Sequence, residues 1–548
     1  MSKLIGLYGG PVAHDAGAVY IKDGQIQSIV QEERPRRVKV ADDPDASPIL
    51  SLDRIKKEFN LDFDEIDYFC TATPMGITSE YWMQYGIDKE KISITNHHDA
   101  HCYGAYYTSG FNEKTLVVSY DAGGISRSRG YNSTFGRTFL AENNKMNIVN
   151  TWPMGTSASI PCMYAMITRW LGWRINKDEG KVTGLAGYGE YNKDVYESFE
   201  KMCWYDEEQK KFGPPHQVES ATGTNIVLDY FGTTGILKDI STNKKSRADL
   251  AYNMQLFLEN KIVEYFNHLH KLYPDYKKIV LSGGVFANVK LNQKLNELDW
   301  VDETYVYPAM SDSGLALGTT IKKAVELGEW ETKRFDNLFY GTKYTQTHID
   351  TLINGINTKT TTDIQRIEYD DKLISKHLNE GSIVGWFKGR FEFGPRALGA
   401  RSILVRPTDA ETHENLNKRL GRTEIMPFAP IVIGEKANDV FITNNKSHYT
   451  AEFMTMCYDT RKEWVDKIPA VIHEVDKSAR PQLVYENNPF YNVLVEYEKL
   501  SNIPVLLNTS FNVHGEPIID GPDQAINHLM DGVVDYLVME DFIYYVNR

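Results

Sequence analysis

The sequence predicts an α/β protein of at least two domains, with a first domain built from two similar halves. A chain of 548 residues is too long to fold around one hydrophobic core. Near the N-terminus a strand, a glycine-rich loop, a strand, a tight turn and a strand follow one another. A similar arrangement recurs about a hundred residues later, and this recurrence indicates an internal duplication.

The two copies have matching predicted elements. The first copy has strands at Leu4–Leu7, Ala18–Ile21 and Ile26–Val30, with the loop GGPVAHDAG after the first strand and the turn Asp23-Gly24. The second has strands at Thr115–Tyr120, Gly136–Leu140 and Met146–Val149, with Asp121-Ala122-Gly123-Gly124 after its first strand. Each copy offers an apolar strand followed by a small-residue loop that carries an aspartate. Such a duplication is typical of actin-like, sugar-kinase-like folds that bind a nucleotide between their halves.

The middle of the chain continues the α/β pattern. Arg247–Leu272 has apolar residues at helical spacing, and Lys278–Leu281 is a short apolar strand that enters the loop at Gly283-Gly284. A strand at Tyr305–Pro308 then leads into the acidic, small-residue stretch Ser311–Gly318. Residues 325–375 are polar and weakly periodic, so we place a domain boundary there.

Composition excludes several classes of protein. A formal net charge of −14 argues against general affinity for duplex nucleic acid or anionic membranes. The first residues, MSKLIGLYGG, do not resemble a signal peptide, and no apolar run is long enough to span a membrane. None of the five scattered cysteines falls in a C-x-x-C motif, which excludes a zinc ribbon and favours a reducing compartment. We therefore expect a soluble cytoplasmic protein.

The stretch NHHDAHCYGAYYTSGF, which begins at Asn96, contains three histidines within five consecutive residues. On a helix, His97 and His101 would lie one turn apart on the same face, where both imidazoles could reach one cation. The alternative is a solvated helix start with no ligand. Two histidines alone do not decide between these interpretations.

Four loops of the first domain each combine small residues with a polar group. They are Asp121 with Gly123-Gly124, Gly180-Lys181, Gly283-Gly284, and Asp312 with Gly314. Glycine exposes backbone N–H groups to phosphates, lysine adds a positive charge, and aspartate can hold a cation. Each loop could also be an ordinary turn. The loop at Asp178–Gly184 lacks the spacing of a P-loop.

The second half contains a loop rich in arginine, Gly389–Ile403, with Arg390, Arg396 and Arg401 separated by Gly, Pro and Ala. The planar guanidinium suits phosphate or carboxylate. Further polar and basic groups follow at Lys418, Arg422, Arg480 and in the stretch Asn508–Asn512. In an acidic chain this concentration predicts a site for a phosphorylated small molecule, although each arginine could instead tie loops together.

Ten short motifs occur in a specific order along nearly the whole chain. They are His14-Asp15-Ala16, Glu32-Glu33-Arg34 through Lys39, His97-His98 with His101, Glu179-Gly180-Lys181 with Gly184-Leu185-Ala186, Gly283-Gly284-Val285 with Asn288, Asp312 with Gly314, Gly394-Pro395-Arg396-Ala397-Leu398-Gly399, Pro427-Phe428-Ala429-Pro430, Arg480-Pro481-Gln482, and Asn508-Thr509-Ser510-Phe511-Asn512. With these motifs the sequence resembles the O-carbamoyltransferases of the nodulation and antibiotic-tailoring type. Met426 departs from the family, which commonly has arginine there.

The resemblance implies two domains with different chemistry. Residues 1–350 would form an actin-like (Kae1-like) domain of the ASKHA superfamily, and residues 360–548 a YrdC-like α/β domain. The second domain would convert carbamoyl phosphate and ATP, with its Mg²⁺, to carbamoyl adenylate and pyrophosphate. The first would pass the carbamoyl group to a substrate hydroxyl and release AMP.

The resemblance also implies site residues. The catalytic residues would be His14, as general base, with Lys39 and Arg396. Carbamoyl phosphate would be bound by Arg390, Arg401, Lys418, Arg422, Arg480, Ser510 and Asn512. The nucleotide would be bound by Gly123, Gly124, Lys181, Gly184, Gly283, Gly284, Asn288 and Gly314. A divalent cation, iron before manganese or zinc, would be bound by His97, His101, Asp121 and Asp312.

Two other functions share these features. A tRNA threonylcarbamoyladenosine-type enzyme would use the same domain types, but the negative charge suits tRNA poorly. A non-catalytic nucleotide-binding switch would be expected to lose reactive residues, which are retained here. The acceptor could be a small molecule, a sugar, or a hydroxymethyl-pyrimidine nucleotide or DNA, since the Lys-, Asn- and Ile-rich composition is typical of an A+T-rich genome. The chain could also form a homodimer.

Overall fold

The computed structural model describes residues 2–10, 13–41, 46–72, 79–124, 134–153, 157–213, 244–359, 363–422 and 426–547. Pro11 and Val12 of the first predicted loop, and residues 360–362 of the weakly periodic stretch, lie outside the described residues. The chain divides into two compact units. Unit 1 comprises Met1–Gln27 and Val40–Asp336, and unit 2 comprises Ser28–Lys39 and Asn337–Arg548.

Two five-stranded sheets have the same topology, and apart from Ser28–Gln31 of β3 their strands belong to unit 1. The first has the order β3-β2-β1-β4-β5, formed by β1 (Lys3–Tyr8), β2 (Gly17–Lys22), β3 (Gln25–Gln31), β4 (Tyr68–Ala72) and β5 (Ile92–Thr95). The second has the order β8-β7-β6-β11-β12, formed by β6 (Thr115–Gly124), β7 (Thr134–Glu142), β8 (Lys145–Pro153), β11 (Lys278–Ser282) and β12 (Glu303–Val306). In each sheet the first strand pairs antiparallel with the second and parallel with the fourth. The predicted internal duplication is therefore present, and the predicted strands are confirmed to within a few residues.

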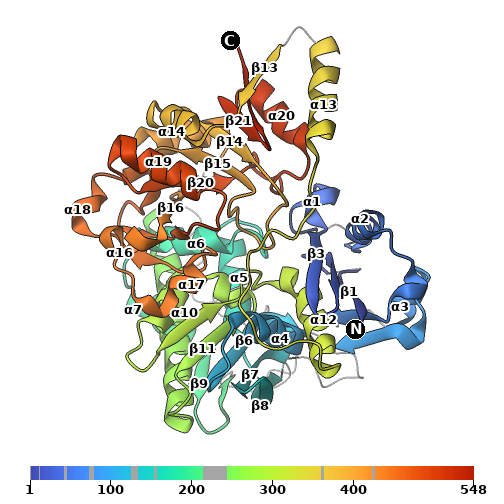
Figure 1. Ribbon diagram of the computed structural model, residues 1–548. Coiled ribbons are helices and arrows are strands. Elements are labelled where there is room, and N and C mark those ends of the chain that lie inside the picture. The colour runs from blue at the N-terminus through green and yellow to red at the C-terminus, as the bar shows by residue number, and fades with distance from the viewer. Residues whose placement is uncertain are drawn as a thin grey trace. The chain divides into compact units, whose positions relative to one another are not determined.

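Two helices lie between these sheets. α4 (His97–Ser109) packs on β6, β7 and β11 of the second sheet, and α12 (Leu315–Glu326) packs on β1, β2 and β4 of the first. The helices also pack closely against each other, because a side chain on Gly318 would meet the carbonyl oxygen of Ala100 at 1.9 Å. Figure 1 shows α4 and α12 in the same region of unit 1. His97, the first residue of α4, lies near Asp312, which comes just before α12.

Other helices pack on the second sheet, through α5 (Ile160–Trp170) and β6, and on β2 of the first sheet. α10 (Lys244–Leu272), the long helix predicted from its periodicity, packs against α5 (Ile160–Trp170), α6 (Glu179–Ala186), α7 (Lys193–Met202) and α11 (Val289–Asn296). A small hairpin of β9 (Trp204–Asp206) and β10 (Lys211–Gly213) packs near β8 and α10. α2 (Ile49–Phe59) packs on β2, and α3 (Ser79–Met83) precedes β5.

Unit 2 is built on a mixed eight-stranded sheet with the order β13-β22-β21-β14-β15-β20-β16-β19. Its strands are β13 (Ile364–Glu368), β14 (Val384–Phe387), β15 (Arg401–Val405), β16 (Ala429–Ile433), β19 (Gln482–Val484), β20 (Val505–Ser510), β21 (Tyr536–Met539) and β22 (Phe542–Val546). Every residue of β14, β15 and β16 is buried, in keeping with the apolar residues that dominate these strands. Both units are thus mixed α/β structures.

Helices and short elements surround this sheet. α14 (Asp371–Asn379) and α19 (Tyr491–Ser501) pack on each other, and α20 (Pro522–Met530) packs on β14, β21 and β22 and contacts α13 (Gln346–Lys359). The remaining elements are α15 (Glu411–Arg419), α16 (Ala437–Val440), α17 (His448–Ala451), α18 (Lys462–Val465), and the pair β17 (Tyr458–Asp459) and β18 (Ser478–Ala479). α1 (Glu33–Arg36) also belongs to this unit.

The division of the chain differs from the boundary placed near residues 350–360. Residues 337–350 belong to unit 2, and so does the early segment Ser28–Lys39. Hydrogen bonds explain its placement: Arg37 donates to the carbonyl oxygens of Pro517 and Ile518, and the backbone N–H of Ile29 donates to Tyr340. Contacts this distant in sequence leave no local pattern from which a boundary could be predicted.

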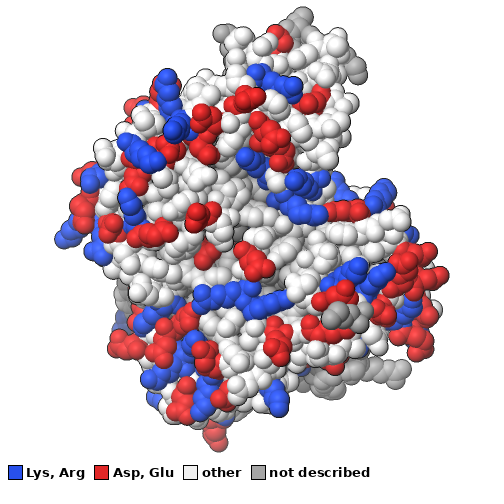
Figure 2. Space-filling view, viewed as in Figure 1, with Lys and Arg blue, Asp and Glu red and all other residues white. Residues whose placement is uncertain are grey.

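Lysine and arginine are interspersed with aspartate and glutamate over the face shown in Figure 2. None of the helices in the described part of the chain combines the length and apolar character needed to cross a bilayer. All five cysteines are free thiols, and four of them are buried.

Candidate functional site

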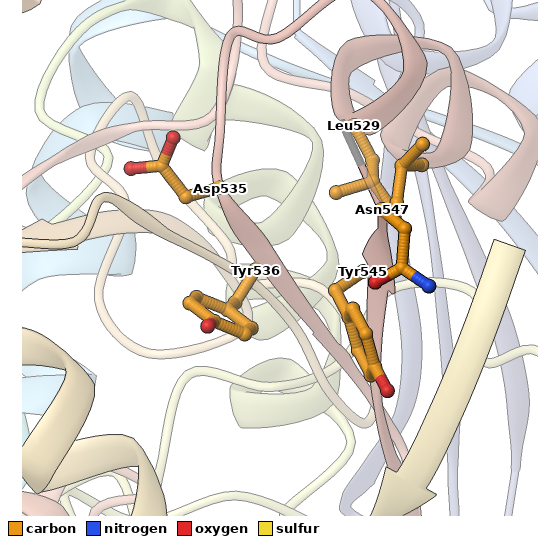
Figure 3. Close-up of a pocket in the computed structure, with 6 residues that line it drawn as sticks. Leu529, Asp535, Tyr536, Tyr545 and Asn547 are labelled. Atoms are coloured by element: carbon orange, nitrogen blue, oxygen red, sulfur yellow. The ribbon is translucent and has the colours of Figure 1, made fainter.

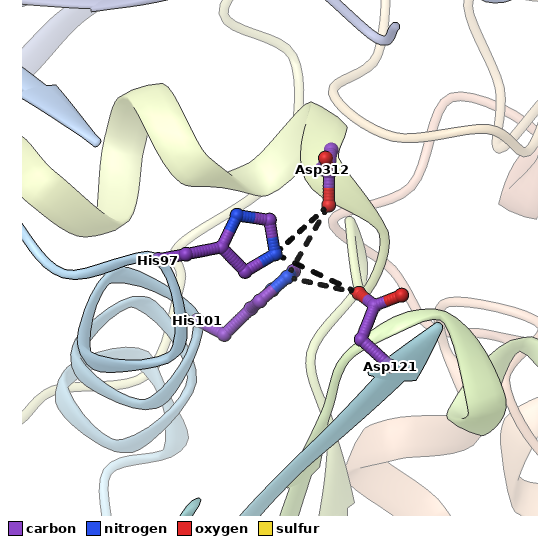
Figure 4. Close-up of side chains that lie close together, drawn as sticks. All are labelled: His97, His101, Asp121 and Asp312. Atoms are coloured by element: carbon purple, nitrogen blue, oxygen red, sulfur yellow. Dashed lines mark ion pairs between the residues drawn. The ribbon is translucent and has the colours of Figure 1, made fainter. Parts of the chain in front are cut away.

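Four predicted ligand residues come together from three elements of unit 1. α4 begins at His97 because the Asn96 side chain accepts hydrogen bonds from the backbone N–H groups at its first turn. His101 follows one turn later, Asp121 lies near the end of β6, and Asp312 begins the turn immediately before α12. Figure 4 shows both imidazoles directed toward both carboxylates.

The geometry of this cluster suits a single cation. His101 Nε2 lies 3.3 Å from Asp121 Oδ2 and 3.4 Å from Asp312 Oδ1, and His97 Nε2 lies 3.9 and 3.4 Å from the same two oxygens. All four ligand atoms lie within 4.8 Å of one another. A tetrahedral N₂O₂ site with metal–ligand bonds of about 2.1 Å would have ligand–ligand separations of about 3.4 Å. The measured separations are close to that value.

Electrostatics also favour a cation here. The Nε2 atoms of His97 and His101 are enclosed, and neither makes a hydrogen bond of acceptable geometry in the described structure. Burial alone would lower the pKa of His101, but contacts with Asp121 and Asp312 outweigh it and raise that pKa to about 9. Two buried carboxylates therefore require positive charge beside them, which imidazole protons or a divalent cation can supply. The donor set fits Fe, Mn or Zn.

The alternative of a solvated histidine patch is wrong. All three histidines are buried, and the neighbouring His98 has a different environment from the two candidate ligands. Its ring nitrogens lie 2.8 Å from Ser119 Oγ and 2.9 Å from the carbonyl oxygen of Thr134. Burial lowers the pKa of His98 well below its usual value, so this ring is neutral and ties α4 to β6 and β7.

His14 borders the cluster. Its Nε2 lies 3.8 Å from Asp312 Oδ2, and its Nδ1 lies 3.4 Å from Asp15 Oδ2. Burial opposes the charged imidazole, but Asp312 and Asp15 raise the pKa of His14 to about 10 when the carboxylates carry no cation. Lys39, the other predicted catalytic residue of the N-terminal region, lies in unit 2.

Sequence reasoning overlooked Tyr8, whose hydroxyl donates to Asp312 Oδ2 at 2.5 Å. It is the last residue of β1 and immediately precedes the pair Gly9-Gly10. Its position at the carboxyl end of a buried strand, beside a glycine loop, is the feature of the sequence that could have indicated a site residue. Without the fold nothing linked it to Asp312, which is 304 residues away.

The predicted nucleotide loops have structural roles of their own. Gly283 has φ +95°, and a Cβ there would lie 2.3 Å from the Tyr120 carbonyl oxygen, so only glycine fits. Gly284 donates its N–H to Asp121 Oδ2 at 3.3 Å. These glycines and Gly123, which precedes Gly124 on β6, lie beside the cluster, whereas Gly314 supports the turn before α12.

Three further nucleotide-binding candidates are placed by helices. Lys181 and Gly184 lie on α6, where Lys181 pairs with Asp178 at 3.1 Å. Asn288 caps α11 through its side chain and hydrogen-bonds to Gln255 of α10. Nucleotide binding by these residues stays a prediction.

In unit 2, Arg396 and Arg480 are both half-buried and lie close enough for their charges to interact. Burial, together with repulsion from Arg480, lowers the pKa of Arg396 well below its usual value, and burial also lowers that of Arg480. Within the described part of the chain no hydrogen bond or ion pair engages either guanidinium, and both Nε atoms are enclosed. Two neighbouring cations without a counter-charge in the described residues would favour an anion, and anion binding by this pair stays a prediction.

The other loop arginines are held by the protein. Arg401 is fully buried, lies over the Phe387 ring at 3.6 Å, and donates to the carbonyl oxygens of Lys388, Gly389 and Ala400. Arg390 donates to the carbonyl oxygen of Gly341 at 2.8 Å. For these two arginines the structure matches the loop-tying alternative.

A third group of predicted residues forms a hydrogen-bonded cluster. Arg422 donates to Thr509 Oγ1, Ser510 Oγ and both the carbonyl and side-chain oxygens of Asn512. Ser510 in turn donates to Asn512 Oδ1 at 2.5 Å. Lys418 is exposed on α15. Met426, the departure from the family pattern, accepts a hydrogen bond at its carbonyl oxygen from His413 at 2.9 Å.

One surface pocket of unit 2 contains none of these residues. It is lined by Leu529, Asp535, Tyr536, Tyr545, Val546 and Asn547 (Figure 3). Asp535 already pairs with Arg419 at 2.7 Å, and Tyr536 stacks on His377 with ring centroids 3.9 Å apart. Its acidic group is thus already paired, and we do not treat the pocket as a candidate site.

Two family models match this chain. The family described as "Carbamoyltransferase N-terminus" matches residues 79–321, and "Carbamoyltransferase C-terminus" matches residues 375–545. Together these matches span well over half of the chain. The chain belongs to the carbamoyltransferase family. It is therefore an enzyme of the transferase class.

Carbamoyltransferase relatives align along most of their length. The chain is 31% identical to a protein of Methanocaldococcus jannaschii, over 97% of this chain and 98% of the relative. It is 29% identical to nodulation protein NolNO of Sinorhizobium fredii, over 97% of this chain and 78% of the relative. A nodulation protein U from the same species is 30% identical over 63% of this chain and 59% of the relative.

Similarity to solved structures is weak. Component A of (R)-2-hydroxyglutaryl-CoA dehydratase from Acidaminococcus fermentans aligns with 59% of this chain and all of its own, at 13% identity and a TM-score of 0.36. Full-length HypF in its phosphate- and nucleotide-bound form aligns with 60% of this chain and 56% of its own, at 15% identity and a TM-score of 0.34.

Proposed function

We propose that this carbamoyltransferase is an ATP-dependent O-carbamoyltransferase that works through carbamoyl adenylate. Water releases phosphate from carbamoyl phosphate, an oxygen of the resulting carbamate attacks the α-phosphorus of ATP, and pyrophosphate leaves. A hydroxyl oxygen of the acceptor then attacks the carbamoyl carbon, and AMP leaves. In this proposal unit 2, as a YrdC-like domain, forms the adenylate, and unit 1, as an actin-like domain, transfers the carbamoyl group.

The pair Arg396 and Arg480 is the observation that carries the first step. Their guanidinium groups repel each other and lack a counter-charge in the described structure, so an anion between them would remove an electrostatic penalty. Carbamoyl phosphate and the phosphates of ATP, bound with Mg²⁺, are such anions. Charge-assisted hydrogen bonds from arginine also stabilise the negative charge that develops as phosphate or pyrophosphate leaves.

The Arg422 cluster suits the uncharged part of the same substrate. Ser510 and Asn512 carry hydroxyl and amide groups that Arg422 holds in place. To bind a carbamoyl group they would exchange their present hydrogen bonds, from Ser510 to Asn512 and from Asn512 to the carbonyl oxygens of Val513 and Glu516, for bonds to the substrate. The closely packed Arg401 supports the loop instead of contacting the ligand. Arg390, Arg401 and Arg422 are held by other groups of the protein, so in this proposal the phosphate contacts are Arg396, Arg480 and the exposed Lys418.

The histidine–aspartate cluster of unit 1 supports the second step. His97, His101, Asp121 and Asp312 would hold a divalent cation, iron in our proposal, which when bound would neutralise charge on the adenylate phosphate. The backbone N–H of Gly284, which donates a hydrogen bond to Asp121 Oδ2, would help to orient that carboxylate. A cation bound to Asp312 would offset the carboxylate charge that raises the pKa of His14, and the neutral imidazole at the edge of the cluster would then accept the proton of the acceptor hydroxyl.

Pyrophosphate release from carbamoyl phosphate and ATP, without acceptor, tests the proposal. We expect activity in the wild type and a loss of at least a hundredfold in Arg396→Ala and Arg480→Ala. Arg366→Ala is the matched control, because Arg366 is an exposed arginine of unit 2 already paired with Asp350 at 2.6 Å. Full activity in Arg396→Ala would refute the assignment of unit 2.

The acceptor requires a separate experiment. Candidate hydroxyl compounds, including sugars and hydroxymethyl-pyrimidine nucleotides, are incubated with carbamoyl phosphate and ATP and analysed by mass spectrometry. An O-carbamoyl product gains the mass of one carbamoyl group in place of the hydroxyl hydrogen, and AMP appears in equal amount. AMP formation without a carbamoylated product would contradict transfer to that acceptor.

A further inference from the structure

The two oxygens of Asp312 have different environments. Oδ1 lies 3.4 Å from the Nε2 atoms of both His97 and His101, which places it on the cation side of the carboxylate. Oδ2 accepts a hydrogen bond from the hydroxyl of Tyr8 at 2.5 Å, and His14 Nε2 lies 3.8 Å from it. One oxygen is thus available to a cation, while the protein already engages the other.

The position of Tyr8 is fixed by close packing. Tyr8 is buried, with 3% of its surface exposed, and its ring meets the edge of His97 with centroids 6.5 Å apart. Its strand, β1, lies directly against α12, because a Cβ on Gly6 would lie 2.0 Å from Thr320 Oγ1 and 2.3 Å from the Ala316 carbonyl oxygen. Since Asp312 begins the turn before α12, this contact sets the distance between the phenol and the carboxylate.

The other ligands have comparable support. The Nδ1 of His101 lies 3.3 Å from Ser282 Oγ, which leaves Nε2 directed at the carboxylates. Asp121 Oδ1 accepts from the backbone N–H of Ala122 at 2.6 Å, so its Oδ2 faces the histidines. Hydrogen bonds of this kind orient metal ligands and restrict their coordination mode.

We infer that Tyr8 is a positioning residue that restricts Asp312 to ligating the cation through Oδ1 alone. The inference rests on the proposed metal centre of unit 1. By occupying Oδ2, the phenol hydroxyl prevents that oxygen from turning toward the cation. Asp312 and Asp121 then each contribute one oxygen, so the protein supplies four ligand atoms and leaves further coordination positions for a substrate oxygen.

A merely structural tyrosine provides the control. The hydroxyl of Tyr265, which is also fully buried in unit 1, hydrogen-bonds to Thr138, and none of these residues belongs to the cluster. Tyr8→Phe and Tyr265→Phe each remove one buried hydroxyl oxygen, so their effects on folding should be similar. Only Tyr8→Phe should change the binding of a cation.

The experiment uses the full chain, stripped of metal by a chelator and titrated with Co²⁺ alone. We expect Tyr8→Phe to bind Co²⁺ 10- to 100-fold more weakly than the wild type, the usual effect of losing a hydrogen bond to a metal ligand. Its visible absorption should also change intensity, because the freed Oδ2 of Asp312 can enter the coordination sphere. Tyr265→Phe should keep the affinity of the wild type within about twofold and the same spectrum.

Two results would overturn the inference. Tyr8→Phe could match the wild type in both affinity and spectrum, or both variants could lose affinity equally, which would mean a general loss of stability. A wild type that binds no Co²⁺ would overturn the metal centre and the role of Tyr8 together. Pyrophosphate release by unit 2 needs no cation in unit 1, so that assay distinguishes failure of the metal centre from failure of the proposed carbamoyl chemistry.

Discussion

Replacing Arg396 by methionine should reduce activity without reducing stability. Methionine retains much of the apolar stem of arginine but removes its charge. In the described structure Arg396 has no acidic partner and is repelled by Arg480. Among the described residues this repulsion is not compensated, and a bound anion would relieve it.

The substitution Arg396→Met should affect stability and catalysis in opposite directions. Relief of repulsion between two partly screened charges is worth on the order of 1 kcal/mol, so Arg396→Met should be as stable as the wild type or more stable by about that amount. Loss of a guanidinium that stabilises developing charge should lower the rate of pyrophosphate formation about 100- to 1,000-fold, or ~2.7–4 kcal/mol of transition-state stabilisation.

Thermal denaturation with and without inorganic phosphate measures the stability effect. We expect the melting temperature of unit 2 in Arg396→Met to equal or exceed that of the wild type by ~2–4 °C. Millimolar phosphate should raise the melting temperature of the wild type but not that of the variant. Arg401→Met is the contrast, because three carbonyl oxygens would lose their buried donor, at a cost of ~3–5 kcal/mol.

Two outcomes would refute this reasoning. If Arg396→Met lost as much stability as Arg401→Met, Arg396 would be a structural residue with partners in the folded protein. If phosphate stabilised Arg396→Met as strongly as the wild type, the anion would bind elsewhere. Either result would remove the reason for placing carbamoyl phosphate at the pair Arg396 and Arg480.

Three further predictions concern unit 1. His97→Ala should abolish binding of a divalent cation, which metal analysis of the purified protein would show. His98→Ala should keep a bound cation but lose ~2–4 kcal/mol of stability, measured by denaturation. Equal metal content in both variants would contradict the ligand assignment. His14→Asn should still release pyrophosphate but transfer the carbamoyl group at least about a hundredfold more slowly, and normal transfer would exclude it as the base. Gly283→Ala should lower the melting temperature strongly, because its Cβ would lie 2.3 Å from the Tyr120 carbonyl oxygen; an unchanged melting temperature would mean that the loop can move.

Local sequence patterns determined much of unit 1. The strands of both sheets and the helix α10 follow from apolar periodicity, because each buries one face in a core. The spacing of His97 and His101 was enough to place both imidazoles on one face of α4. The ordered motifs were enough to identify the family, since their residue types and order are properties of the sequence itself.

The arginines show where sequence reasoning stops. Arg390, Arg396 and Arg401 lie within twelve residues and have the same side chain. In the structure Arg401 is enclosed by carbonyl groups of its own loop and Arg390 is bonded to Gly341, while Arg396 is left beside Arg480 without a partner in the described residues. Which guanidinium is free depends on how β14 and β15 bring the loop together, and no local pattern records that.

Sequence alone thus determined the family, the duplicated strand pattern and the identities of the four candidate ligands. The tertiary structure alone decided that Ser28–Lys39 belongs to unit 2, that His98 lies within hydrogen-bond distance of Ser119 and Thr134, and that Tyr8 donates a hydrogen bond to Asp312. The physical reason is the same in each case. Periodicity and motifs depend on residues that are close together along the chain. These contacts join residues that lie far apart in the sequence and meet only when the elements pack together.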